Sequence, residues 1–439
     1  MLAQYYQILK ELVSIKSISW EKKYTDEIIW CATFLHGLLQ EHGFVSEIIE
    51  WYGNPIVFGG FFVDKKLPTC LLYGHYDVQP AHKSEWWQHD PFSLHIGKDK
   101  IYGRWVVDNK GQFLIHLLTL FALAEERKLW YNVKIVIEWN EETGSWSFEQ
   151  FMTDHRQELL ADFCLISDSS LANNSPCIDA GYRWCINARL EITTAHTDLH
   201  SWEYGGIVPN AIHEMNKLLA KLYDMNHHIT IPYFYYDVQE IPFDVLIKNK
   251  KIKIDMQKIM HDTGVKTFFQ EKNLDLMTQI GLKPTIQVTG ISGWHTGDWF
   301  KNAIPNISTA HLNFRLVKNQ TISKVMGAFE QWLKTSLPTH LDYTLEYEES
   351  TAQPIKVDLE NIYAKRAMTV LEKVYDAPVI QTYCGWSIPI VYMLEHILWI
   401  KQVMVPLANE DSHAHGSDEN FDIAAIERGF AFSAKFFAE

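Results

Sequence analysis

The sequence predicts an α/β protein in which one domain, with a mixed sheet and helices on both faces, is interrupted by an inserted α+β domain. Two observations predict this fold class. Short apolar runs of strand character alternate with helical patterns near both ends of the chain, which is typical of a sheet covered on both faces. Between them, strands of alternating polarity and amphipathic helices indicate an antiparallel sheet with helices on one face. We therefore place the first domain at 1–184 and 355–439, and the insert at 185–354.

The first part of the chain carries clear periodic signals. Apolar residues recur at helical spacing over 5–13 and 28–39, and Gly43 lies just past the second run as a stop signal. A third, strongly apolar helix is expected over 113–126. Short runs rich in apolar and β-branched residues predict strands at 56–63, 70–73, 133–139 and 163–166.

The same periodicity of apolar residues predicts the elements of the insert and of the second part of the first domain. In the insert, alternating patterns predict strands at 185–194, 308–317 and 342–348, and amphipathic patterns predict helices at 210–223 and 322–337. After the insert we expect helices at 359–375, 389–395 and 421–437, with strands at 379–383 and 403–407. No internal repeat interrupts this order.

Composition excludes several classes of protein. With 47% hydrophobic and 21% charged residues, the chain is an ordinary globular protein, and no apolar run reaches membrane-spanning length. A formal net charge of −15 argues against a nucleic-acid partner, because such proteins concentrate Lys and Arg. Six cysteines without C-x-x-C spacing indicate reduced thiols. We therefore expect a cytoplasmic protein that binds neither nucleic acid nor membrane.

A histidine and a carboxylate follow the predicted strand at 70–73. His75 and Asp77 are two residues apart, so in extended chain their side chains can project the same way from the carboxyl end of that strand. This geometry suits a metal ligand and the acid that orients it. A hydrogen-bonded loop pair is the ordinary alternative for such a pair taken alone.

Four more polar clusters are expected at the ends of predicted strands. They contain Asp108, the pair Glu141 and Glu142, Asp168, and finally His413 and His415 before Asp418 and Glu419. Each one alone also fits a solvated turn, a helix N-cap or a surface loop. Together, two histidines and several carboxylates at the same edge of one sheet can surround two divalent ions.

At this point the chain resembles the dipeptidase branch of the M20 metallopeptidases. Nine motifs occur in the family's order, among them G-H-x-D-V-x-P at Gly74 to Pro80, D-P-F at Asp90 to Phe92, G-R-x-x-x-D-N-K-G at Gly103 to Gly111, E-E-x-G-S at Glu141 to Ser145, D-L-H-S at Asp198 to Ser201, R-L-V-x-N-Q at Arg315 to Gln320 and H-x-x-x-E at His415 to Glu419. The resemblance covers nearly the whole chain. It implies a zinc-peptidase-like fold in which the insert is a lid and dimerisation domain.

The resemblance also implies a set of metal ligands. One ion would bind His75 and Asp168, the other would bind Glu142 and His415, and Asp108 would bridge them. The ions would be zinc, with manganese or cobalt as alternatives. His413 competes with His415 for the last position, and we prefer His415 because the family's histidine lies four residues before its glutamate. Asp77 would fix the tautomer of His75, and the Asp108–Asn109 peptide bond would be cis.

The implied reaction is hydrolysis of the peptide bond of dipeptides or short peptides. Glu141 would be the general base for a water that bridges the ions, and His200 would stabilise the oxyanion in the active site of a partner subunit, which makes the protein a homodimer. Arg315 would bind the substrate carboxylate, although a surface ion pair is the ordinary alternative. Asn302 and Ser387 would contact substrate. An N-acyl amino-acid deacylase and an inactive peptide-binding relative are the competing functions.

The chain departs from the family in one repeated way. Tryptophan stands where the family has glycine or another small residue at Trp86, Trp105, Trp139, Trp184, Trp202, Trp294, Trp299 and Trp386. Tryptophan cannot adopt positive φ as cheaply as glycine can, and bulky insertions tend to overpack. Our hypothesis is that many of these tryptophans correspond to UGA codons, which one genetic code reads as tryptophan but the source organism decodes as glycine.

Overall fold

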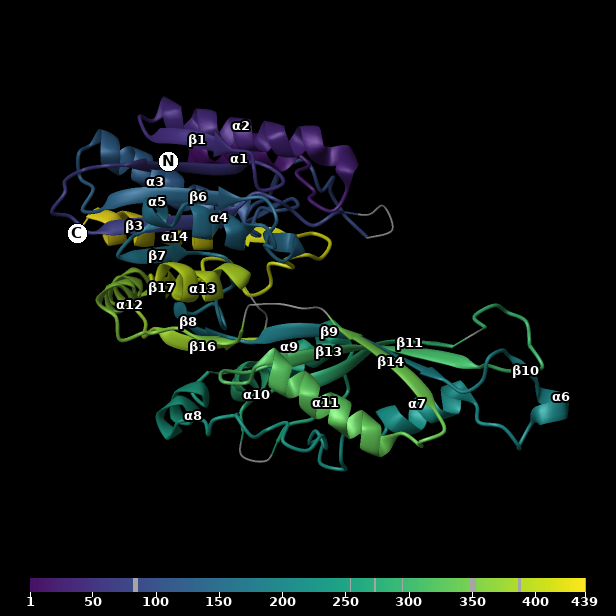
Figure 1. Ribbon diagram of the computed structural model, residues 1–439. Helices are drawn as coiled ribbons and strands as arrows, with labels where there is room; N and C mark the ends of the chain where they lie inside the picture. Colours follow the sequence, from purple (N-terminus) through teal and green to yellow (C-terminus); the bar gives the residue numbers. More distant parts are fainter. Residues whose placement is uncertain are drawn as a thin grey trace. The chain divides into compact units, whose positions relative to one another are not determined.

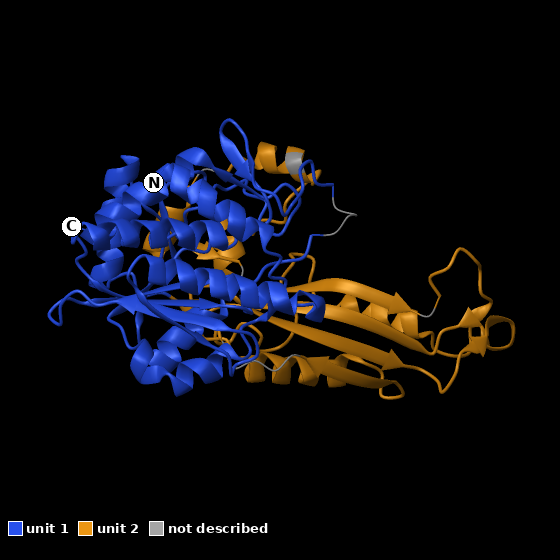
Figure 2. Ribbon diagram, turned by 90° about the horizontal axis from the view of Figure 1, so that it is seen from above, with its two compact units in different colours: residues 1–180, 357–382, 388–439 blue, residues 181–356, 383–387 orange. Residues whose placement is uncertain are grey.

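The computed structural model describes the chain except residues 82–85, 253, 272–273, 294, 348–352, 386–387 and 439. Three residues singled out above, Trp294, Trp386 and Ser387, therefore lie outside the described residues. The chain divides into two compact units, which Figure 2 colours separately. Unit 1 comprises residues 1–180, 357–382 and 388–439, and unit 2 comprises residues 181–356 and 383–387.

A six-stranded mixed sheet forms the centre of unit 1 (Figure 1). Its strands, in spatial order, are β1 (Val45–Ile49), β2 (Ile56–Phe61), β6 (Asn132–Glu138), β3 (Thr69–His75), β7 (Phe163–Ile166) and β17 (Lys401–Met404). β3 runs parallel to β6 and β7, β7 runs parallel to β17, and β2 runs antiparallel to β1 and β6. The carboxyl ends of β3, β6 and β7 therefore meet at one edge of the sheet, where α/β proteins build their sites.

Helices cover this sheet, and the expected mixed α/β fold is confirmed. The long helices of unit 1 are α1 (Leu2–Ser14), α2 (Thr25–Glu41), α3 (Lys110–Glu125), α12 (Ile362–Tyr375) and α14 (Ile423–Ala438). α3 packs against β3, α1 and α14, whereas α2 packs against β1 and β2. Most of α3 is buried, as expected for a helix that is apolar all round. No helix in the described part of the chain is long and apolar enough to cross a membrane.

Shorter elements complete unit 1. They are the helices η1 (Lys22–Tyr24), η2 (Glu141–Thr143), α4 (Phe148–Asp154), α5 (Arg156–Leu159), α13 (Pro389–Met393) and η3 (Leu394–Leu398), and a small sheet of β18 (Asn420–Asp422), β5 (Lys100–Tyr102) and β4 (His95–Ile96). Another three-stranded sheet, whose residues are divided between unit 1 and unit 2, has the order β15 (Ile355–Lys356), β8 (Cys177–Tyr182) and β16 (Ile380–Cys384).

Unit 2 is built on an antiparallel sheet. Its strands, in spatial order, are β11 (Thr285–Gly293), β13 (Ile307–Leu316), β9 (Trp184–Thr193) and β14 (Asp342–Tyr347). The helix α7 (Ala211–Leu219) packs against β9 and β13. The helix α11 (Ile322–Ser336) places Phe329 edge-on to Phe314 of β13, with ring centroids 5.2 Å apart. The remaining elements are β10 (Leu199–His200), β12 (Ala303–Ile304), α6 (Ser201–Tyr204), α8 (Phe243–Asn249), α9 (Met256–Thr263) and α10 (Leu276–Leu282).

Some strands were not predicted from the sequence. β1 and β11 are edge strands, each with a single buried residue, so neither shows the apolar run or the clean alternation that marks a buried strand. β8 was also missed. Residues 383–387 group with unit 2 although they follow the insert in sequence.

Candidate metal centre

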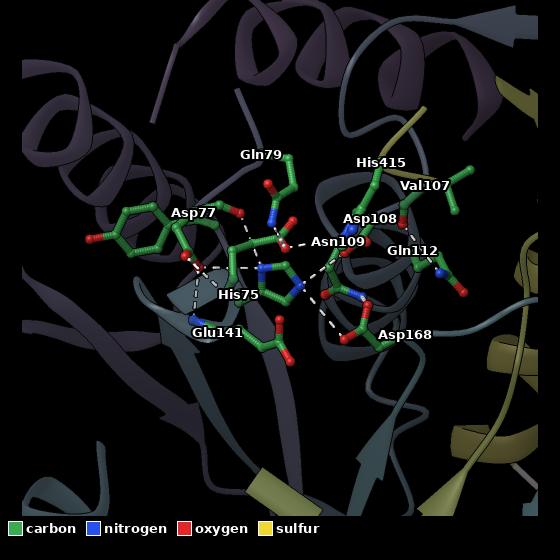
Figure 3. A network of polar contacts seen from close by, with 12 residues as sticks. His75, Asp77, Gln79, Val107, Asp108, Asn109, Gln112, Glu141, Asp168 and His415 are labelled. Carbon is green, nitrogen blue, oxygen red and sulfur yellow. Dashed lines mark hydrogen bonds and ion pairs between the residues drawn. The ribbon is translucent and has the colours of Figure 1, made fainter. Parts of the chain in front are cut away.

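His75 ends β3 and is fully buried. Its Nε2 lies 3.1 Å from Asp108 Oδ1 and 3.6 Å from Asp168 Oδ2, as Figure 3 shows. On the other side of the ring, Nδ1 lies 3.1 Å from the backbone oxygen of Asp77. Burial alone would lower the pKa of His75, but the surrounding carboxylates, Asp168 first among them, hold it well above its ordinary value. The ring therefore lies in a strongly anionic environment.

A second histidine approaches the same aspartate from a different part of the chain. His415 Nε2 lies 2.8 Å from Asp108 Oδ2 and 3.1 Å from Glu142 Oε2. Despite some burial, these two carboxylates raise the pKa of His415 to about 11. The two oxygens of Asp108 thus face two different histidines, which is the arrangement of a carboxylate that bridges two ions. His413 lies in the same turn and belongs to neither group.

The donor atoms form two groups that share Asp108. His75, Asp108 and Asp168 form one, and Asp108, Glu142 and His415 form the other; within each, the atoms lie within 4.8 Å of one another. Histidine nitrogens and carboxylate oxygens are ordinary ligands of zinc and similar ions. Burial raises the pKa of Glu142 to about 7, and Glu142 Oε1 is buried without a hydrogen-bond partner among the described residues. A crowded, incompletely satisfied anionic cluster of this kind fits two divalent cations.

One expectation about Asp108 was wrong. It does not follow a strand of the main sheet, but lies between β5 of the small sheet and the first turn of α3. Its neighbour Asn109 ties this turn to the loop after β7, because Asn109 Nδ2 donates to Ser167 O at 2.6 Å and to Asp168 Oδ1 at 2.8 Å. The expected cis peptide bond between Asp108 and Asn109 is confirmed. Contacts between distant loops therefore bring Asp108 to the sheet edge.

Asp77 lies behind His75 and is fully buried. Its Oδ1 accepts a hydrogen bond from the backbone N–H of Glu141 at 3.1 Å and lies 3.4 Å from His75 Nδ1. Its Oδ2 accepts hydrogen bonds from Ser19 Oγ at 2.9 Å and from the backbone N–H of Glu142 at 3.2 Å. Asp77 therefore contacts the histidine and also holds η2, the turn that carries both glutamates. This second contact was not predicted from the sequence.

Glu141 is the first residue of η2, and Figure 3 shows its side chain beside those of His75 and Asp168. Burial raises the pKa of its carboxyl well above the ordinary value, and the nearby carboxylates of Asp168 and Glu142 raise it further. A carboxyl with a raised pKa can accept a proton near neutral pH.

Sequence reasoning also missed Gln79, whose Nε2 donates to Glu142 Oε2 at 2.7 Å.

The other candidate residues with described positions belong to unit 2. His200 ends β10, is exposed, and accepts a hydrogen bond on Nδ1 from the backbone N–H of Trp202 at 3.1 Å. β10 pairs with β12, and Ser201 N donates to Asn302 O at 3.0 Å, so His200 and Asn302 are neighbours. Arg315 lies near the C-terminal end of β13, and its Nε donates a hydrogen bond to Asn313 Oδ1 at 3.2 Å.

The tryptophans at the positions noted above fall into two kinds. Trp105, Trp139 and Trp184 are buried, and their indole N–H groups find no acceptor among the described residues. The others with described positions, Trp86, Trp202 and Trp299, are 91%, 90% and 78% exposed. Trp105 has φ 63°, and Trp399, which the sequence did not single out, has φ 62° at the end of η3. Positive φ is the region that favours glycine.

The chain is similar to known proteins over most of its length. Residues 71–439 match the model of Peptidase family M20/M25/M40. The chain is 27% identical to the Beta-Ala-His dipeptidase of Rattus norvegicus over 400 residues, 88% of this chain and 80% of that protein. It is 26% identical to the Cys-Gly metallodipeptidase DUG1 of Candida albicans over 455 residues, 97% of this chain and 92% of that protein.

The chain is also similar to solved structures of known peptidases. The M20 family metallo-carboxypeptidase Sso-CP2 from Sulfolobus solfataricus is 26% identical, with a TM-score of 0.88 over 98% of both chains. Human carnosine dipeptidase 1 is 25% identical, with a TM-score of 0.80 over 99% of this chain and 96% of that chain. The resemblance to M20 metallopeptidases is thereby confirmed. The chain belongs to the M20/M25/M40 family of peptidases.

Proposed function

We propose that this protein is a dinuclear metal-dependent dipeptidase that hydrolyses dipeptides or short peptides with free termini. The observation that carries the proposal is Asp108, whose two carboxylate oxygens face His75 and His415 at 3.1 and 2.8 Å. Two ions that share one carboxylate can clamp and polarise a substrate between them. Membership of the M20 family and relatives named dipeptidases, which match at least 88% of this chain, support the proposal.

Five side chains would hold the ions. His75 and Asp168 would be ligands of the first ion, Glu142 and His415 would be ligands of the second, and Asp108, which belongs to both groups of donor atoms, would serve both. Zinc is the ion we propose, with manganese and cobalt as alternatives, because the same nitrogen and oxygen ligands serve all three.

The protein's own groups would perform the proton transfers. When bound, the ions supply a water of lowered pKa and polarise the scissile carbonyl. Glu141 takes the proton of the attacking water and delivers it to the leaving amine, and its raised pKa favours proton uptake. Asp77 keeps the His75 ring in place and holds the turn on which Glu141 lies.

Unit 2 would supply contacts to the substrate. We propose that exposed His200 stabilises the oxyanion in the active site of a partner subunit, so that the active protein is a homodimer formed through the inserted domain. The fork of Arg315 suits a substrate carboxylate, since it offers two parallel hydrogen bonds. Asn302, next to His200, and Ser387 would complete the contacts to the peptide. The proposed location is the cytoplasm.

A hydrolysis panel tests the function. Purified protein is incubated with Zn²⁺, Mn²⁺ or Co²⁺ and with dipeptides, N-blocked dipeptides, and N-acetyl and N-succinyl amino acids. We expect free dipeptides to be cleaved, and Glu141→Gln to retain both ions with turnover reduced about 10²- to 10⁴-fold. Cleavage of N-acyl amino acids alone would indicate a deacylase, and cleavage of N-blocked dipeptides alone would indicate a carboxypeptidase. Two bound ions without any hydrolysis would favour the inactive peptide-binding alternative.

A further inference from the structure

We infer that the ion pair of Arg104 and Glu419 is a positioning pair that holds His415 against Asp108 and thereby sets the affinity of the second ion. The second ion is the one held by Asp108, Glu142 and His415, so the inference rests on the proposed function for the presence of two ions. Neither Arg104 nor Glu419 touches the donor groups of the cluster. Both act through the backbone of the loops that carry these groups.

The pair is isolated from solvent. Arg104 is 1% exposed, Glu419 is not exposed, and Arg104 Nη1 lies 3.2 Å from Glu419 Oε2. The Trp87 ring lies over the guanidinium, with its centroid 4.8 Å from Cζ. Transfer of two charges from water to such a site is costly unless further hydrogen bonds satisfy them. Loop backbone groups around the cluster supply hydrogen bonds to Nη1 and Nη2 of Arg104 and to Oε1 of Glu419.

Glu419 holds the segment that leads into Asp108. Its Oε1 accepts hydrogen bonds from the backbone N–H groups of Val107 at 3.1 Å and Asp108 at 3.2 Å. Its own backbone oxygen accepts from Gly103 N at 3.1 Å. The residue that ends the His415 turn is thus hydrogen-bonded to both ends of the segment 103–108.

Arg104 connects the same turn to a third loop. Its Nη1 donates to Gly416 O at 2.9 Å, directly after His415 in the chain. Its Nη2 donates to Pro80 O at 3.4 Å, in the loop that follows His75 and Asp77. One buried side chain therefore joins three loops that are far apart in sequence: two carry the proposed ligands Asp108 and His415, and the third follows the strand that ends at His75.

The turn that carries His415 needs such support. His413, His415 and Asp418 have φ values of 55°, 64° and 53°, so three residues with side chains occupy the left-handed region within this turn. Strained residues persist only when their surroundings hold them. Loss of the buried pair would let the turn relax, and His415 Nε2 would move away from Asp108 and Glu142.

The first ion should depend less on this pair. Its ligand His75 ends β3 and its ligand Asp168 follows β7, two neighbouring strands of the main sheet, and Asn109 ties Asp108 to the loop after β7. Val107 O also accepts a hydrogen bond from Gln112 Nε2 at 3.2 Å, so the segment before Asp108 keeps an anchor without Glu419 (Figure 3). The inference therefore predicts unequal effects on the two ions.

Cobalt titration of the protein comprising residues 1–439 tests whether the two ions lose affinity unequally. The variants are Glu419→Gln, which keeps an acceptor for the backbone N–H groups, and Arg104→Lys, which keeps the charge but loses the fork. The control is Arg366→Lys, because Arg366 donates to the backbone oxygens of Phe436 at 2.9 Å and Lys435 at 3.2 Å and contacts no ligand loop. Stoichiometry is measured by calorimetry and elemental analysis, and the geometry of each site by the visible absorption of bound Co²⁺.

We expect both variants to bind the first ion as the wild type does and the second about 10- to 100-fold more weakly, with a changed Co²⁺ spectrum for that step only. The control should leave both steps unchanged. Wild-type affinities for both ions in both variants, or equal weakening of the two steps, would overturn the inference. If the wild type binds two ions and the variants behave as expected, but no peptide is hydrolysed, the proposed function fails and the inference stands. A wild type that binds only one ion overturns both.

Discussion

Trp105 offers a sharp test of whether the tryptophans at small-residue positions are native. The perturbation is Trp105→Gly. Trp105 has no exposed surface, φ 63° and an indole N–H without an acceptor among the described residues. Removal of an ordinary buried tryptophan side chain costs about 3–5 kcal/mol of unfolding free energy.

Two penalties that tryptophan carries at this position act against this loss of unfolding free energy. Left-handed backbone costs a residue with a Cβ about 1–2 kcal/mol, and an unsatisfied buried N–H costs about 1–3 kcal/mol. Glycine removes both penalties, which together are comparable with the loss of the buried side chain. If the surrounding core evolved around glycine, its side chains also fill the space that the indole ring leaves. Little destabilisation from a cavity then remains. We therefore expect Trp105→Gly to be at least as stable as the chain with tryptophan.

Chemical denaturation monitored by circular dichroism measures the difference. The matched control is Trp332→Ala, because Trp332 is 6% exposed on the packed face of α11, and we expect that variant to lose about 3–5 kcal/mol. A loss of 3 kcal/mol or more in Trp105→Gly would refute the reasoning. The gene provides an independent check: we expect UGA at Trp105 and Trp399 and UGG at Trp332, and peptide mass spectrometry of native protein should find glycine at the first two.

Three further predictions concern the metal centre and the core. Asp77→Asn should lower the unfolding free energy by about 2–3 kcal/mol, because a charged acceptor of three hydrogen bonds is lost, whereas Ser19→Ala removes one of them and should cost about 1 kcal/mol; equal losses in denaturation would contradict this. Zn²⁺ at one hundred times its Kd should stabilise chelator-treated protein by about 2.7 kcal/mol per site, and a melting temperature that does not respond to Zn²⁺ would argue against resident ions. Burial lowers the pKa of His116 to about 3, so below the unfolded-state pKa of about 6.5 only the unfolded chain takes up this proton and stability falls with decreasing pH. By pH 5 this loss is about 2 kcal/mol, and His116→Gln should remove it, so a pH-independent difference between variant and wild type would disprove the assignment.

The sequence by itself determined the local elements that have strong periodic signals. The apolar runs before His75 and Asp168 and the largely apolar stretch at 113–124 are local properties, because burial on both faces requires apolar side chains at nearly every position. The motifs also determined which side chains could serve as donors. Edge strands such as β1 and β11 escaped prediction, since an exposed edge demands no such pattern.

The tertiary structure alone decided how these donors meet. Whether His413 or His415 faces Asp108 depends on backbone angles in one turn, and those angles depend on a buried ion pair with a residue more than three hundred positions away. The double role of Asp77, which contacts the His75 ring and holds the turn of Glu141, likewise joins segments that no local pattern connects. Pattern and propensity describe neighbours in sequence, whereas a two-ion site requires atoms from distant loops to lie within a few ångströms of one another.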